Sequence, residues 1–105
     1  MQNHFIPLLA ISLLVPALAQ AAEITVTMAG ANYQPARISA AVGDTIRFVN
    51  DDAELHNVFV PTAGFATDLG KQEAGTEAVL ALGKAGKFEV ECVLHSHMLI
   101  EVEVK

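Results

Sequence analysis

The chain has 105 residues, with six basic and twelve acidic side chains and a formal net charge of −6, which allows one small domain. This acidic balance argues against nucleic acid or an anionic membrane surface as a partner, because both carry dense negative charge. A basic protein or a bound cation fits the charge better.

The start of the chain predicts a secretory signal peptide over residues 1–22, followed by a single domain over residues 23–105. Residues 1–22 contain no Asp, Glu, Lys or Arg, and their apolar run ends in the small-residue stretch Ala17–Ala22. Pro16 interrupts this run, which is shorter than the roughly 20 residues needed to cross a bilayer. We therefore expect an exported, periplasmic protein whose mature chain is not inserted in a membrane.

Apolar and polar residues alternate with a period of two after the leader, which predicts an all-β domain. The expected strands run over residues 24–28, 37–41, 45–50, 58–60, 76–82, 87–92 and 99–104. A turn at Gly83–Gly86 predicts that the fifth and sixth of these form a hairpin, and a turn is also expected over Gly30–Pro35. Residues 62–75 show little periodicity and are expected to be a long connection. Short strands separated by turns indicate a β-sandwich.

Cys92 is the single cysteine, and export makes it informative because an unpaired thiol outside the cytoplasm is exposed to oxidation. A buried inert thiol, an intermolecular disulfide and a metal ligand are the three explanations for such a residue.

The segment that begins at Cys92 concentrates side chains that can bind a metal. It contains Cys92, His95, His97 and Met98, and His56 lies far upstream. Two imidazoles, one thiolate and a distant thioether form the soft donor set of a blue-copper site. Structural zinc sites usually have several thiolates or a paired spacing that is missing here. Alone, each residue has an ordinary explanation, such as core packing or a hydrogen-bonded turn, but together they favour copper.

Three motifs connect the chain with one family: GDTIRFVN at residues 43–50, HNV at residues 56–58 and CxxHxxM at residues 92–98. In these motifs the chain resembles the cupredoxins, the small blue-copper proteins that include plastocyanin, pseudoazurin and amicyanin. The resemblance covers essentially the whole chain after the leader, and the short spacing of the last motif is similar to that of amicyanins. It implies a Greek-key β-sandwich of about seven to eight strands.

The resemblance also implies the site. One type 1 copper ion would have His56, Cys92 and His95 as equatorial ligands and Met98 as the axial ligand. Asn57 would make hydrogen bonds that fasten the two ligand-bearing segments together.

The chain departs from the family pattern next to these ligands. The family commonly has Thr, Ser or Ala after the cysteine and Pro before the loop histidine, where this chain has Val93 and Leu94. These two replacements are expected to alter the hydrogen bonds around the thiolate and the reduction potential. His97 is an alternative ligand in a Cys-x4-His arrangement, whereas the amicyanin-like spacing favours His95 and leaves His97 in solvent.

The expected function is that of a periplasmic carrier that passes one electron between redox proteins. The sequence offers no second metal cluster, substrate pocket or base–nucleophile pair, so we do not expect an enzyme. The alternative is a periplasmic copper carrier or sequestering protein that uses His97 and Met98 for transfer. A metal-free interaction domain would leave Cys92 unexplained. The expected partners of this monomer are a basic c-type cytochrome or a periplasmic dehydrogenase.

Four carboxylates are expected on one outer face, because the cysteine strand and the last strand are neighbours in the cupredoxin fold. These are Glu89, Glu91, Glu101 and Glu103. A solvated face that keeps a small exported protein soluble is the ordinary interpretation, and a docking patch is the other.

Overall fold

The computed structural model describes residues 2–11 and 20–105. Residue 1 and residues 12–19, which include part of the predicted leader, lie outside the described residues, so the leader remains a prediction. In the described part of the chain there is no helix of the length and hydrophobicity that a membrane crossing requires.

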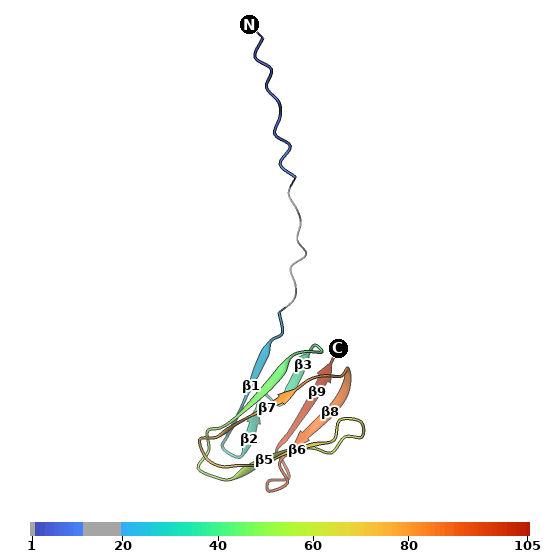
Figure 1. Cartoon of the computed structure of the whole chain (residues 1–105). Helices are drawn as coiled ribbons and strands as arrows, with labels where there is room; N and C mark the ends of the chain where they lie inside the picture. The colour runs from blue at the N-terminus through green and yellow to red at the C-terminus, as the bar shows by residue number, and fades with distance from the viewer. Residues whose placement is uncertain (1, 12–19) are drawn as a thin grey trace.

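Within the described residues, nine strands form two sheets that pack face to face (Figure 1). They are β1 (Glu23–Ala29), β2 (Asn32–Gln34), β3 (Arg37–Ala40), β4 (Thr45–Asn50), β5 (His56–Val60), β6 (Thr67–Gln72), β7 (Glu77–Ala81), β8 (Gly86–Glu91) and β9 (Leu99–Val104). One sheet has the order β2-β1-β4-β7 and the other has the order β3-β9-β8-β5-β6. β1 with β4 and β3 with β9 are parallel pairs. The predicted all-β sandwich is confirmed.

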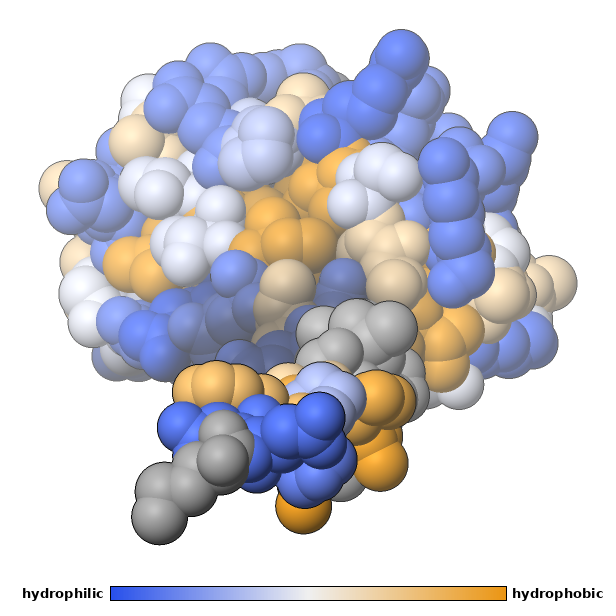
Figure 2. Space-filling view, turned by 90° about the horizontal axis from the view of Figure 1, so that it is seen from above, coloured by the Kyte–Doolittle hydropathy of each residue, from blue (hydrophilic) through white to orange (hydrophobic). Residues whose placement is uncertain are grey.

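The alternation seen in the sequence places one side of each strand in the core. In β9, Ile100, Val102 and Val104 are at most 3% exposed, whereas Glu101 and Glu103 face solvent. Figure 2 views the end of the sandwich that carries the C terminus and shows apolar side chains among hydrophilic ones. Burial of apolar side chains between the two sheets is the main stabilising contribution to such a fold.

The expectation of a long unstructured connection over residues 62–75 is wrong, because β6 lies within it. β6 pairs with β5 alone and forms an edge of its sheet. An edge strand with a partly solvated face does not need a regular row of apolar side chains. The register shifts between Val58 and Phe59, and Gly70, opposite Val58, has a φ of 78°. This irregularity and the polar composition conceal the period of two in the sequence.

The predicted hairpin around Gly83–Gly86 is also wrong. β7 pairs with β4, whereas β8 pairs with β9 and β5, so this turn crosses from one sheet to the other. A Cβ atom at Gly86 would lie 2.5 Å from the Phe65 ring, which explains why a glycine enters β8 here. A turn signal marks where the chain reverses, but it does not determine which strands pair.

The sequence predicted a turn over Gly30–Pro35, and the structure shows that this region also contains β2, which forms a hairpin with β1. Gly30 and Ala31 adopt φ values of 57° and 54° and connect the two strands, and the short β2 lies within the predicted Gly30–Pro35 turn. The tip of this hairpin contacts the site described below.

Candidate metal centre

The residues expected to bind metal meet at one end of the sandwich. His56 is the first residue of β5, and Cys92 follows directly after the last residue of β8. The loop from Cys92 to Met98 joins β8 to β9 and lies at the end of the molecule opposite the C terminus (Figure 1).

Backbone hydrogen bonds close this loop on itself. The His95 N–H donates to Cys92 O at 3.2 Å, and the Met98 N–H donates to His95 O at 2.9 Å. The Cys92 N–H in turn donates to Met98 O at 3.3 Å. The loop therefore returns Met98 to Cys92 and holds His95 at a fixed place between them.

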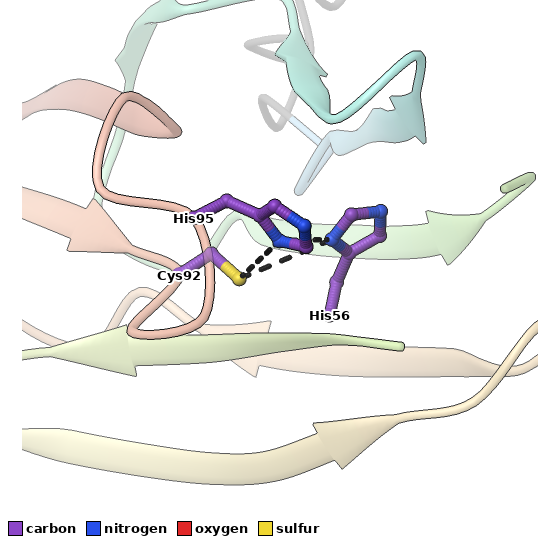
Figure 3. A group of neighbouring side chains, drawn as sticks. All are labelled: His56, Cys92 and His95. Carbon is purple, nitrogen blue, oxygen red and sulfur yellow. Dashed lines mark hydrogen bonds between the residues drawn. The ribbon is translucent and has the colours of Figure 1, made fainter. Parts of the chain in front are cut away.

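Three donor side chains converge, as Figure 3 shows for His56, Cys92 and His95. Their ligand atoms all lie within 4.8 Å of one another. The two Nδ1 atoms are 3.2 Å apart, and Cys92 Sγ lies 3.9 Å from His56 Nδ1 and 3.7 Å from His95 Nδ1. His56 and Cys92 are 0% and 2% exposed.

These distances fit a trigonal metal site. Bond lengths of about 2.0 Å to imidazole nitrogen and about 2.3 Å to thiolate sulfur, as found for zinc, place donors in one plane about 3.5 Å and about 3.7 Å apart. The observed separations of 3.2, 3.7 and 3.9 Å are close to these values. A set of two nitrogens and one sulfur, with His56 and Cys92 buried and His95 partly exposed, favours copper over the hard cations, which prefer oxygen.

The outer nitrogens of both rings contact carboxylates. His56 Nε2 lies 2.8 Å from Asp52 Oδ2, and His95 Nε2 lies 2.9 Å from Glu54 Oε2. Because an ionised carboxylate only accepts hydrogen bonds, each Nε2 carries the proton of its ring. With Nε2 protonated, the neutral form of each ring presents its Nδ1 lone pair toward the other ring and toward the sulfur, an arrangement that a cation between them would stabilise.

Asp52 connects the site to the β1–β2 hairpin. Its carboxylate accepts hydrogen bonds from the Gly30 N–H at 3.2 Å and the Ala31 N–H at 2.9 Å, in addition to the His56 ring. The hydrogen bonds from Ala31 and then from His56 lower the pKa of Asp52. Asp52 is therefore ionised at neutral pH.

Asn57 fastens the two ligand-bearing segments, as the family resemblance implied. Its N–H donates to Cys92 Sγ at 3.4 Å, and its Oδ1 accepts from the Val93 N–H at 2.7 Å. The Tyr33 hydroxyl donates to Asn57 O at 2.7 Å, and burial raises the pKa of Tyr33, so that this hydroxyl stays protonated. Asn57 therefore holds both the sulfur and the start of the loop against β5.

Met98 and His97 have different surroundings. Met98 is buried in the same hydrophobic cluster as Cys92. The His97 side chain is exposed, and its Nε2 lies 2.6 Å from Ala31 O. His97 is outside the group of three donors in the described part of the chain.

Sequence reasoning missed Asp52 and Glu54, because carboxylates in a polar run such as Asn50–Glu54 ordinarily face solvent. Buried Asn50 organises this loop: its side-chain amide donates to Glu54 O at 2.9 Å and to Gln72 O at 2.8 Å. The available signal for a contact with imidazole was that Glu54 and Asp52 lie two and four residues before His56.

The four predicted carboxylates share the outer face of β8 and β9, with Glu89 directly opposite Glu101. Two cations lie among them. Arg37 Nη2 is 3.0 Å from Glu101 Oε2, and Lys87 is opposite Glu103. The face is therefore less negative than the four carboxylates alone suggest.

Comparisons with known proteins agree with this geometry. A family model described as a cupredoxin-like domain matches residues 4–102. The Cu(I) form of an amicyanin mutant is 28% identical, covers 85% of this chain and 87% of its own, and superposes with a TM-score of 0.73. No curated protein sequence matches the chain.

Two further solved structures share the fold at lower identity. A purple cupredoxin from Nitrosopumilus maritimus is 17% identical, with 78% of this chain and 99% of its own covered and a TM-score of 0.68. A copper-containing nitrite reductase from Thermus scotoductus SA-01 is 21% identical with a TM-score of 0.69. That alignment covers 79% of this chain but only 22% of the enzyme.

Proposed function

The chain belongs to the cupredoxin-like family, and on this basis we propose that it is a periplasmic electron carrier with one type 1 copper ion. The proposed ligands are His56, Cys92 and His95 in the equatorial plane and Met98 in the axial position. The observation that carries the proposal is the convergence of one sulfur and two Nδ1 atoms within 4.8 Å, with His56 and Cys92 buried and His95 partly exposed.

Copper in such a site supplies a one-electron couple between Cu(II) and Cu(I). The protein holds the donors nearly rigid. Backbone hydrogen bonds close the ligand loop, Asn57 joins it to β5, and Asp52 orients His56. A site that changes little between the two oxidation states exchanges electrons with a small reorganisation cost. His95, which is 24% exposed at its side chain, connects the buried donors to the surface and is the proposed exit for the electron.

Burial of the donors supports a carrier rather than an enzyme. His56 and Cys92 are almost fully buried, so a small-molecule substrate has no direct access to an ion held between them. An electron can still pass through the His95 ring to a partner that contacts the loop. The proposed partners are redox proteins, such as a basic c-type cytochrome or a periplasmic dehydrogenase, that bind a monomer of this chain.

The second candidate function is a copper carrier or sequestering protein. The exposed His97 ring favours it, because its centroid lies 6.2 Å from that of His95 and it could receive an ion at the surface. This function needs tight binding of Cu(I), whereas electron transfer needs a reversible Cu(II)/Cu(I) couple in one fixed site.

Titration with Cu(II), followed by visible absorption, tests the proposal. We expect an intense blue thiolate-to-copper band that saturates at one copper per chain. Cys92→Ser should abolish the band and keep the far-ultraviolet circular dichroism of the sandwich, since the thiolate supplies the charge transfer and not the core packing. A colourless Cu(I) complex without the band would favour the copper carrier, and no copper uptake would contradict both functions.

A further inference from the structure

The exposed edge of the His95 ring contacts a carboxylate. His95 Nε2 lies 2.9 Å from Glu54 Oε2, and Nδ1 of the same ring lies 3.7 Å from Cys92 Sγ. The Glu54 side chain is 62% exposed, so the contact lies at the surface, directly outside the donor group. One ring therefore touches both the buried thiol and a surface charge.

The contact selects one tautomer of His95. Because a carboxylate only accepts hydrogen bonds, Nε2 carries a proton, and in the neutral ring Nδ1 then presents its lone pair to Cys92 and His56. Without this acceptor, a neutral ring could hold its proton on Nδ1, which would remove one donor from the site. Glu54 therefore favours the form of His95 that can bind a metal.

The main chain holds Glu54 in place for this role. Its carbonyl oxygen accepts a hydrogen bond from the side-chain amide of Asn50 at 2.9 Å. Asn50 is itself buried and donates a second hydrogen bond to Gln72 O at 2.8 Å. An exposed carboxylate is thus anchored, through its own backbone, to the interior of the sandwich.

The carboxylate also acts through its charge. A hydrogen bond to a carboxylate makes the imidazole a more basic ligand. A nearby negative charge stabilises Cu(II) more than Cu(I), because the attraction grows with the charge of the ion. Solvent weakens the Coulombic part at this exposed position, whereas the hydrogen bond is made directly to the ligand ring. Both effects of Glu54 lower the reduction potential.

We propose that Glu54 is a positioning residue for His95, which holds the ring with its Nδ1 free and lowers the reduction potential of the site. The electrochemical part rests on the proposed function. Asp52 has the corresponding place at buried His56, so the two imidazoles are oriented by two carboxylates of the same loop. Of these two, Glu54 acts on the ring through which an electron would leave.

Three variants test this role by spectroelectrochemistry of the copper protein. Glu54→Gln removes the charge and keeps an acceptor oxygen, Glu54→Ala removes both, and Glu103→Gln removes an equal charge from the outer face of β9. In Glu54→Gln we expect the affinity for Cu(II) relative to Cu(I) to fall about tenfold, which raises the potential of a one-electron couple by about 59 mV. Glu54→Ala should raise it at least as much, and Glu103→Gln should leave it nearly unchanged.

Nitrogen NMR of the metal-free protein gives a readout that does not depend on copper. Wild type and Glu54→Gln should keep the ring proton of His95 on Nε2, whereas Glu54→Ala should give a mixture of tautomers. Equal potentials in Glu54→Gln and Glu103→Gln, or an unchanged His95 tautomer in Glu54→Ala, would overturn the proposal. A wild-type protein without the blue band would overturn the proposed function instead, and the tautomer measurement would still decide the role of Glu54.

Discussion

His95 and His97 share the loop between β8 and β9, but their rings face different partners. The inner nitrogen of His95 faces Cys92 and His56, whereas Nε2 of His97 contacts the carbonyl of Ala31 in the β1–β2 turn. A difference of two positions in the loop therefore separates a candidate ligand from a contact with a neighbouring hairpin.

This difference predicts opposite effects of two alanine substitutions. His95→Ala should remove or transform the blue band, because the site loses one of its three close donors. His97→Ala should leave the band nearly unchanged and lower the free energy of unfolding by about 1 kcal/mol or less, since it loses one exposed hydrogen bond. Visible absorption and electron paramagnetic resonance of the Cu(II) forms measure the first effect, and urea denaturation measures the second. The reverse pattern would mean that the Cys-x4-His spacing binds the metal.

At the scale of residues, the sequence pointed to the three side chains that meet in the structure, but not to the carboxylates that orient two of them. Cys92 and His95 were identifiable from one motif that holds the single cysteine, and His56 from the resemblance of residues 56–58 to the cupredoxins. Asp52 and Glu54 were not, because a carboxylate in a polar loop has the same appearance whether it faces water or an imidazole. Their role depends on a turn that buried Asn50 builds, and that turn exists only in three dimensions.

At the scale of elements, one aspartate joins two strands at the end of the sandwich away from the metal centre. Asp44 accepts hydrogen bonds from the Ala41 N–H at 2.9 Å and from the Ala22 N–H at 2.8 Å. The hydrogen bond from Ala41 closes the turn between β3 and β4 and remains in a chain cleaved after residue 22, whereas Ala22 is the last residue of the predicted signal peptide. These hydrogen bonds, first that from Ala41, lower the pKa of Asp44.

A lowered pKa in the folded state predicts the direction of the pH dependence. The stabilisation by Asp44 is fully present above the unfolded pKa of about 3.9 and is lost as the pH falls through the lower folded value. Asp44→Asn should therefore be less stable than wild type at pH 7 and should lose less stability on acidification. Urea midpoints of the metal-free proteins at neutral and acidic pH measure this, with Asp51→Asn as a control for the loss of one carboxylate. Parallel losses in wild type and Asp44→Asn would contradict the assignment.

Strand positions were predictable where apolar residues alternate, and strand partners were not. The expected bounds of β4 and β9 agree with the structure, because Ile46, Phe48 and the apolar residues of β9 follow a period of two without interruption. β6 was missed because pairing with β5, and not its own composition, makes it a strand. The turn before β8 was located correctly, but the sheet to which each flanking strand belongs is decided by contacts distant in sequence.

At the scale of the whole molecule, a net charge of −6 predicts how a partner is found. Attraction to a basic surface raises the rate of association, and salt screens it, with a Debye length of about 10 Å at 0.1 M. Electron transfer with a basic c-type cytochrome should therefore slow by about tenfold or more from low to high salt in stopped-flow measurements. Rates that do not depend on salt with every basic partner would indicate docking through exposed Val93 and Leu94 beside His95.

Stopped-flow rates of charge variants identify the surface that attracts a basic partner. Substituting glutamine for the carboxylates on the outer face of β8 and β9 should slow association more than Glu73→Gln and Glu77→Gln. Glu77 already pairs with Arg47 at 3.4 Å, so it presents less charge to a partner. Arg37 pairs with Glu101 and partly neutralises its charge. Glu89→Gln should therefore slow association more than Glu101→Gln. An equal effect at all positions would mean that only the net charge matters.

β9 completes the sheet that carries the candidate metal centre. β9 lies between β3 and β8, so this sheet stays in two parts until residues 99–104 have docked. Pairings between segments this far apart in sequence form slowly, because a long loop must close before they form. The same step returns Met98 to Cys92 and brings the loop against His56. We therefore expect a chain without a docked β9 to have no assembled donor group, and a metal to bind after this strand is in place.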